Sequence, residues 1–196
     1  MFHVSCFMFL AGCFNEPEPA YRSVPAENRI YLKDSPARGD LKGDLEAFKA
    51  GAAIDYVNLD RNALTNVDEV ASLTGLKWLR LNDNRLEALP DLSALANLRR
   101  VYLRGNRFTA VPETLKALPA LTDVDLSENP ISEIPEWLAE KRGLEALSFS
   151  RTRVEKLPAD LSAWKSLNEL QLGDLKIAPE EMARIRAALP KTAVVF

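Results

Sequence analysis

Asp123 and Asp125 are the side chains in this sequence whose type and spacing come closest to a catalytic pair. On an extended segment they share one face and lie about 6–7 Å apart, a separation compatible with acid and base roles in glycoside hydrolysis. With Glu128 they are also a candidate site for a divalent cation. We expect neither, because nothing in the sequence predicts a closed pocket that would separate two pKa values, and few oxygens converge on a cation. The sequence therefore predicts no catalytic residue, no metal site and no cofactor.

Length and charge set further bounds on function. The chain has 196 residues, of which 47% are hydrophobic and 27% charged, as in an ordinary globular protein with a sizeable core. Its 25 Lys and Arg residues against 28 Asp and Glu residues give a formal net charge of −3. Because there is no global basic field to hold phosphate backbones, we expect no nucleic-acid partner.

The N-terminal residues combine a short apolar run with a cysteine. The run over residues 2–14 is too short to cross a bilayer, which takes about 20 residues, but its length suits a secretory signal. A buried N-terminal strand or helix is the alternative. The residues Leu10-Ala11-Gly12-Cys13 resemble a bacterial lipobox. This resemblance implies that residues 1–12 are a lipoprotein signal peptide and that Cys13 carries the acyl chains that anchor the protein to a membrane.

Cleavage before Cys13 would change the chemistry available to the chain. His3 and Cys6 would leave with the signal peptide, and Cys13 would be alkylated. Catalysis by histidine or cysteine, Cys/His zinc sites and disulfides would then be unavailable. Residues 13–28, with three prolines, predict a flexible tether. Phe14 stands where an aspartate retains enterobacterial lipoproteins in the inner membrane, so the resemblance favours the outer membrane.

Internal repetition dominates the rest of the sequence. The repeated lines begin at Ile54, Leu76, Leu98, Leu121, Leu144 and Leu167, at intervals of 22 or 23 residues. This pattern resembles the leucine-rich repeat family, in the variety that reads LxxLxLxxNxLxxLPxxLxxLxx, over about residues 45–196. The resemblance implies an α/β solenoid of about six repeats over residues 53–175, with a curved parallel sheet on its concave face and the leucines pointing inward.

One asparagine recurs at the same position of the repeat. The resemblance implies that its side-chain amide satisfies backbone groups in neighbouring coils, so that the asparagines form a structural ladder. Thr152 supplies part of this bonding in the fifth repeat, whereas Leu175 in the sixth supplies none. The predicted ladder consists of Asn62, Asn84, Asn106 and Asn129.

The open ends of a solenoid need caps. Residues 29–52 predict an N-terminal cap with a helix that carries Leu41, Leu45 and Phe48 on one face, while residues 28–34 predict a small strand of unassigned position. Residues 176–196 predict a C-terminal cap. It consists of a helix with Met182, Ile185 and Leu189 on one face, followed by a strand from Thr192 to Phe196 that covers the last repeat.

The predicted strands place aromatic, arginine and acidic side chains in columns on the concave face. Trp, Tyr and Arg give binding hot spots because they bring a large contact area and directional hydrogen bonds. Residues 77–107 contain seven basic and three acidic residues, whereas residues 112–145 contain three basic and eight acidic ones, so the face is dipolar. The alternative is a solvated face with Arg–Asp pairing across strands. The candidate partner-binding residues are Tyr56, Trp78, Arg80, Arg100, Tyr102, Arg104, Asp123 and Asp125.

These features favour a non-catalytic module that binds a protein partner in the bacterial cell envelope and is held at the membrane through Cys13. One alternative is a cytoplasmic recognition or scaffold protein, for which residues 1–13 would be part of the folded chain or a misread start. A second alternative is an enzyme or effector subunit, which we expect less because the predicted cap leaves no room for a catalytic domain.

Overall fold

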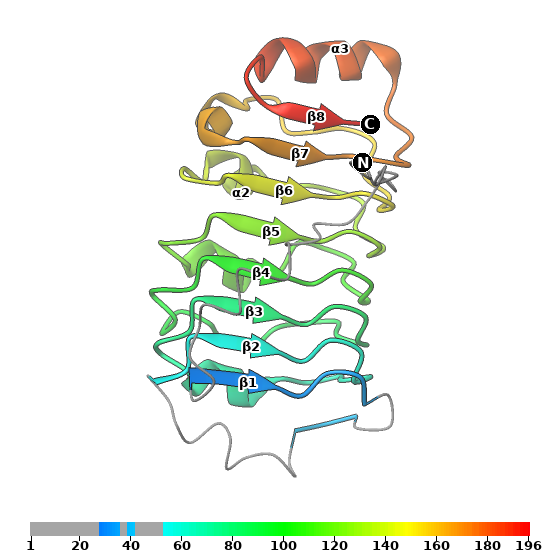
Figure 1. The fold of residues 1–196 in the computed structure, drawn as a ribbon. Helices are drawn as coiled ribbons and strands as arrows, with labels where there is room; N and C mark the ends of the chain where they lie inside the picture. Colours follow the sequence, from blue (N-terminus) through cyan, green and yellow to red (C-terminus); the bar gives the residue numbers. More distant parts are fainter. Residues whose placement is uncertain (1–27, 36–38, 42–52) are drawn as a thin grey trace, which may run out of the picture.

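A computed structural model describes residues 28–35, 39–41 and 53–196 of the chain. These residues form an eight-stranded parallel sheet in which every strand neighbours the next one along the chain (Figure 1). The predicted α/β solenoid is therefore confirmed. The strands are β1 (Arg29–Tyr31), β2 (Tyr56–Asn58), β3 (Trp78–Arg80), β4 (Arg100–Tyr102), β5 (Asp123–Asp125), β6 (Ala146–Ser148), β7 (Glu169–Gln171) and β8 (Ala193–Val195).

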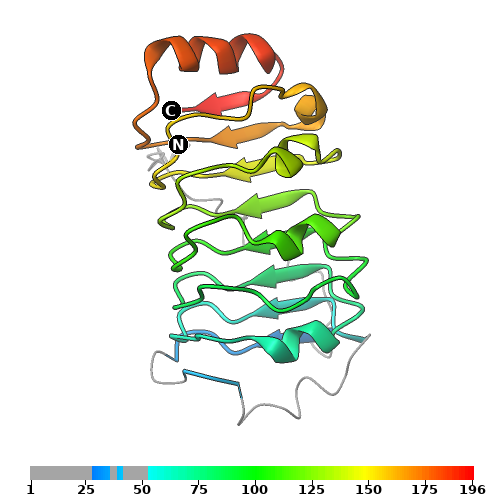
Figure 2. The same cartoon turned by 180° about the vertical axis from the view of Figure 1, so that it is seen from behind.

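The segments between the strands return along the other face of the sheet, as Figure 2 shows from behind. Several of them contain one short helical segment, and the rest of each return is turn or irregular backbone. These segments are the 3₁₀ helices η5 (Asp68–Ser72), η6 (Glu113–Ala117) and η7 (Ser162–Ser166) and the helix α2 (Glu136–Glu140). Because a three-residue strand and a short return use only 22 or 23 residues, successive strands stack in register without insertions.

The core lies between the sheet and the return segments. The middle residue of each strand from β2 to β7 points inward and is fully or almost fully buried, because a strand alternates its side chains between two faces. Leu76, Leu98 and Leu144 are likewise completely buried. On the convex side, the fully buried indole of Trp164 donates from Nε1 to the carbonyl of Leu138 at 2.8 Å, which joins two adjacent repeats.

The N-terminal end of the sheet carries a strand that the repeat pattern alone does not place. β1 pairs in parallel with β2, with Ile30 opposite Val57, and Ile30 is buried against the core. Leu41 is also buried. The rest of the predicted capping helix, with Leu45 and Phe48, lies outside the described residues. So do the predicted signal peptide over 1–12, Cys13, and the tether apart from Asn28.

The C-terminal end is closed by a helix and a strand. α3 (Pro179–Ala188) buries Ile185, and β8 then pairs in parallel with β7. Arg184 donates to the carbonyls of Leu157 and Pro158 at 3.2 and 3.0 Å, and thereby fastens α3 to the preceding repeat. Among the described residues, no helix is both long enough and apolar enough to span a bilayer.

Candidate functional site

The sheet register brings the predicted binding residues into two columns on its open face. One column runs through Tyr56, Trp78, Arg100 and Asp123, which are direct partners on adjacent strands. The other column runs through Asn58, Arg80, Tyr102 and Asp125. Neighbouring strands lie about 4.8 Å apart, so successive side chains of a column touch.

The first column is an aromatic and ionic stack. The rings of Tyr56 and Trp78 meet edge to face, with centroids 5.9 Å apart and an interplanar angle of 82°. The guanidinium of Arg100 lies over the Trp78 ring at 4.9 Å from its centroid, a favourable cation–π geometry. Arg100 Nε is also 3.7 Å from Asp123 Oδ2. Each side chain of this column therefore holds the next one in place.

In the second column, Arg80 is fixed by two different neighbours. Its Nε donates to Asp60 Oδ2 at 3.0 Å, and its guanidinium carbon lies 5.5 Å from the centre of the Tyr102 ring. Asp60 is almost completely buried, so this ion pair is shielded from water on one side. Its Oδ1 accepts from the Asn82 N–H at 2.8 Å, which ties the pair to the backbone of the next repeat.

A third row of charges follows the strands along one rim. Arg104 Nη2 is 3.0 Å from Glu128 Oε1, and Arg151 Nη1 approaches the same oxygen at 2.8 Å. Arg151 Nε in turn is 3.0 Å from Asp174 Oδ2. The Glu128 carboxylate, considered above as a cation ligand, is thus engaged by two arginines. Among the described residues, no cluster of three or more His, Cys, Asp or Glu side chains is arranged to hold a metal ion.

The eight candidate residues differ in what they expose. Tyr56, Tyr102 and Asp125 retain only 1%, 3% and 3% of their surface, because the long side chains of the neighbouring strands pack beside them. The other five, Trp78, Arg80, Arg100, Arg104 and Asp123, are half-buried. The three buried residues therefore support the five half-buried side chains and present little contact area of their own.

Burial also separates the two aspartates that the sequence places as a pair. Asp125 Oδ1 accepts from the Ser127 N–H at 2.9 Å, and burial raises the pKa of the Asp125 carboxyl above its usual range. Asp123 is half-buried, accepts a hydrogen bond from the Thr122 hydroxyl and faces Arg100. One carboxylate is thus enclosed, and the other is held by a hydroxyl and a guanidinium.

The asparagines form a continuous ladder beneath this face. Asn106 is representative: its Nδ2 donates to the carbonyls of Leu81 and Leu103, both at 2.9 Å, and its Oδ1 accepts from the Leu86 N–H at 3.1 Å. Equivalent side-chain bonds are made by Asn62, Asn84 and Asn129. The prediction that Thr152 supplies part of this bonding in the fifth repeat is wrong: its Oγ1 accepts from the Val154 N–H of its own repeat at 3.4 Å, and among the described residues its hydroxyl bonds to no neighbouring coil, because it is too short to reach one.

Sequence reasoning gave too little weight to the acids that hold the arginines. Asp60 lies two residues after β2 and Glu128 three residues after β5, and neither is among the predicted binding residues. Both stand one repeat away from the arginine that they contact. A search for opposite charges spaced by one repeat would have found them.

The comparisons with known proteins agree with this architecture. The sequence profile of the Leucine Rich Repeat family matches residues 120–140. No curated protein sequence matches the chain. Among solved structures, the crystal structure of an internalin from Listeria monocytogenes is similar, with a TM-score of 0.61 at 20% identity. The match covers 78% of this chain but only 53% of the internalin chain. Together with the eight parallel strands and the repeat spacing, these matches show that the chain has the leucine-rich repeat fold.

Proposed function

We propose that this protein is a non-catalytic module that binds a protein partner through the concave face of its repeats. The observation that carries the proposal is the strip formed by Trp78, Arg80, Arg100 and Arg104, in which every arginine is already held by an acid one repeat away. Long side chains that are fixed before binding lose less conformational entropy when a partner docks. Trp and Arg are also the residue types that most often dominate binding energy.

A photo-crosslinking experiment tests this proposal. A crosslinking amino acid is placed at position 78 on the concave face or, as the matched control, at the exposed Thr109 in a return segment, and captured proteins are identified by mass spectrometry. We expect a protein captured from position 78 but not from position 109, and loss of that capture in the Arg100→Ala variant. Identical captures from both positions would contradict a concave binding face.

We further propose that the module is a lipoprotein of the bacterial cell envelope, tethered through Cys13, with the outer membrane as the favoured location. The support is the sequence Leu10-Ala11-Gly12-Cys13 after an apolar run, and Phe14 in place of an aspartate. Metabolic labelling with a palmitate analogue tests the anchor, with the variants Cys13→Ala and Cys6→Ala. We expect label and membrane association to disappear only in Cys13→Ala. Absence of label from the wild type would favour the cytoplasmic alternative.

A further inference from the structure

The two halves of the concave face carry opposite charge. Each strand contributes to this face and its rims together with the residue before it and the three residues after it. Over β2, β3 and β4 the bases are Arg61, Lys77, Arg80, Arg99, Arg100 and Arg104, and the acids are Asp55, Asp60 and Asp83. Over β5, β6 and β7 the acids are Asp123, Asp125, Glu128, Glu145, Glu169 and Asp174, and the base is Arg151. A partner that matches this face therefore carries the reversed order of charges.

The face itself has that reversed order when it is turned end for end. A two-fold axis parallel to the strands, between β4 and β5, places β4 of one copy over β5 of the other, and likewise β3 over β6, β2 over β7 and β1 over β8. Because neighbouring strands are in register, residues at the same position of the repeat then face each other. Such a contact is isologous, so every pair of facing residues occurs twice.

In this arrangement the charged residues of one copy face opposite charges of the other. At the positions that β2 to β7 contribute, no charged residue faces a like charge. Asp83 and Glu145 are exposed and form no ion pair with another described residue, and each of them gains a base of the second copy. The oppositely charged facing pairs are Lys77 with Glu145, Arg100 with Asp123, Asp83 with Arg151, and Arg61 with Asp174.

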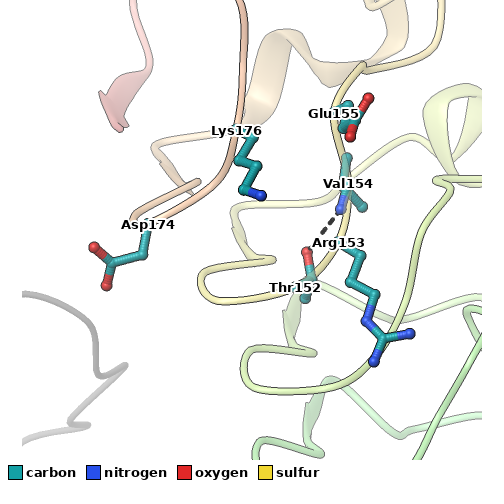
Figure 3. A pocket seen from close by; sticks show the side chains of 6 residues that line it. All are labelled: Thr152, Arg153, Val154, Glu155, Asp174 and Lys176. Atoms are coloured by element: carbon teal, nitrogen blue, oxygen red, sulfur yellow. Dashed lines mark hydrogen bonds between the residues drawn. The ribbon is translucent and has the colours of Figure 1, made fainter.

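Asp174 and Arg61, at the two ends of one rim, remain accessible although each already has a partner in its own copy. Asp174 borders a surface hollow of about 370 Å³, and Figure 3 shows its carboxylate pointing away from the other side chains that line this hollow. Its side chain is 72% exposed while it contacts Arg151, and the side chain of Arg61 is 52% exposed while it contacts Asp34. Both groups therefore have surface left for a contact with the second copy.

Side-chain size and polarity match in the same arrangement. The large side chains of Trp78 and Arg80 on β3 face the small residues Ala146 and Ser148 on β6. At the ends of the sheet, Tyr31 faces Val195. Among the described residues these two are the large hydrophobic side chains that stay exposed, at 43% and 38%. Because two curved faces leave most space between their central strands, the long side chains of β3 and β4 lie where they are needed to fill it.

The size of the face sets how many strands must take part. Figures 1 and 2 show the described helices behind the sheet or, for α3, beyond β8, so none of them covers this face. Strands about 4.8 Å apart and residues about 3.3 Å apart give the eight-stranded face an area of roughly 700 Å². A stable interface takes about 800 Å² from each partner, so a dimer needs the whole face. The axis between β4 and β5 is the one that uses all eight strands.

We propose that the partner of the concave face is a second copy of this chain, docked face to face and end for end about the axis between β4 and β5. The inference rests on the proposed binding face and names its partner. Near the axis, Arg100 and Asp123 of both copies form one cluster of alternating charge, and Lys77 and Glu145 pair on each side of it. Since ion pairs supply much of the contact, association weakens as the salt concentration rises.

Sedimentation velocity over a series of concentrations tests the proposal. All samples are the full chain with Cys13→Ala in a reducing buffer, so that neither an acyl chain nor a disulfide contributes to association. Lys77→Glu and Glu145→Lys each reverse one charge of a facing pair, and they are measured separately and as an equimolar mixture. Lys116→Glu and Glu133→Lys are the matched controls, because they make the same charge changes at exposed positions of the return segments.

We expect the parent chain to form a reversible dimer, and each of Lys77→Glu and Glu145→Lys to weaken it by about tenfold or more, because two like-charge contacts replace two attractive ones. The mixture should dimerise like the parent chain, since a pair of the two different variants has opposite charges at both contacts. The two controls should leave dimerisation unchanged.

The proposal is overturned if the parent chain stays monomeric, if the mixture of the two variants stays as weak as each variant alone, or if the controls weaken the dimer equally. Photo-crosslinking from position 78 separates this failure from that of the proposed function. A monomeric chain from which position 78 captures a different protein refutes self-association and leaves the binding face in place. Identical captures from positions 78 and 109 contradict the binding face itself.

Discussion

The ladder asparagines make equivalent bonds, yet the structure predicts different costs for removing them. In Asn106→Ala, the carbonyls of Leu81 and Leu103 lose one donor each but keep another, from Asn84 and Asn129 respectively. Only the buried Leu86 N–H is left without its acceptor. An unsatisfied buried donor costs about 1–3 kcal/mol, so we expect the free energy of unfolding to fall by about 2 kcal/mol.

Asn129→Ala should cost more. It removes the acceptor of the Phe108 N–H at 3.1 Å, as Asn106→Ala does for Leu86. In addition, the Leu126 carbonyl loses its donor at 3.0 Å, and Thr152 in the next repeat does not replace it. With two unsatisfied groups in place of one, we expect a loss about 1 kcal/mol larger than that of Asn106→Ala.

Urea unfolding followed by circular dichroism measures both values. Asn168→Ala is the control, because Asn168 is an exposed asparagine outside the ladder and should change the free energy of unfolding by less than about 0.5 kcal/mol. If Asn129→Ala costs no more than Asn106→Ala, the bond-by-bond account of the ladder is wrong. If both cost as little as the control, the asparagines have no structural role.

Three further predictions concern single sites. Gly105 has a φ of +65°, and the methyl group of Gly105→Ala would lie against the Asp83 carboxylate, so thermal unfolding should show the protein destabilised by about 1–2 kcal/mol. Gly143→Ala should cost less, because Gly143 also has a positive φ, +84°, but open space around it. Asp125→Asn should flatten the pH dependence of unfolding: the buried Asp125 has a raised pKa in the fold, so the wild type loses stability as the pH rises from about 4 through that pKa. Trp164→Phe removes the indole hydrogen bond to the Leu138 carbonyl, which keeps the Lys141 N–H as a donor at 3.2 Å, and should lower the free energy of unfolding by about 0.5–1.5 kcal/mol in urea.

The repeat spacing was sufficient to predict the fold because each strand is specified by the same few positions. Leu79 and Val101 are the middle residues of their strands in the sequence pattern and are fully buried partners in the sheet. β1 could not be placed this way, since Ile30 lies outside the repeat spacing and finds its partner Val57 only through the sheet edge. Local pattern therefore predicts the repeats but not the strand that closes their end.

The candidate site was predictable in position but not in exposure. The register fixed which side chains share a column, yet Tyr102 is buried because Arg80 lies over its ring, a contact that depends on side-chain conformation. The end of the ladder at Leu175 was predicted from the sequence. The further loss of the hydrogen bond between the Lys176 N–H and the Val154 carbonyl, which is not formed within the described part of the chain, follows only from the structure.

Leu175 also decides how the last repeat is joined to the one before it at the ladder position, where the Val154 N–H bonds within its own repeat. Replacing Leu175 with Asn should add a bond to Val154 and favour the missing bond from Lys176, each worth about 1 kcal/mol. It also removes a half-buried side chain that packs on the core, at a cost of similar size. We expect the free energy of unfolding of Leu175→Asn to stay within about 1 kcal/mol of the wild type, while hydrogen exchange at the Val154 and Lys176 amides slows. Unchanged exchange would mean that the residue at the ladder position does not control the hydrogen bonds between the last two repeats.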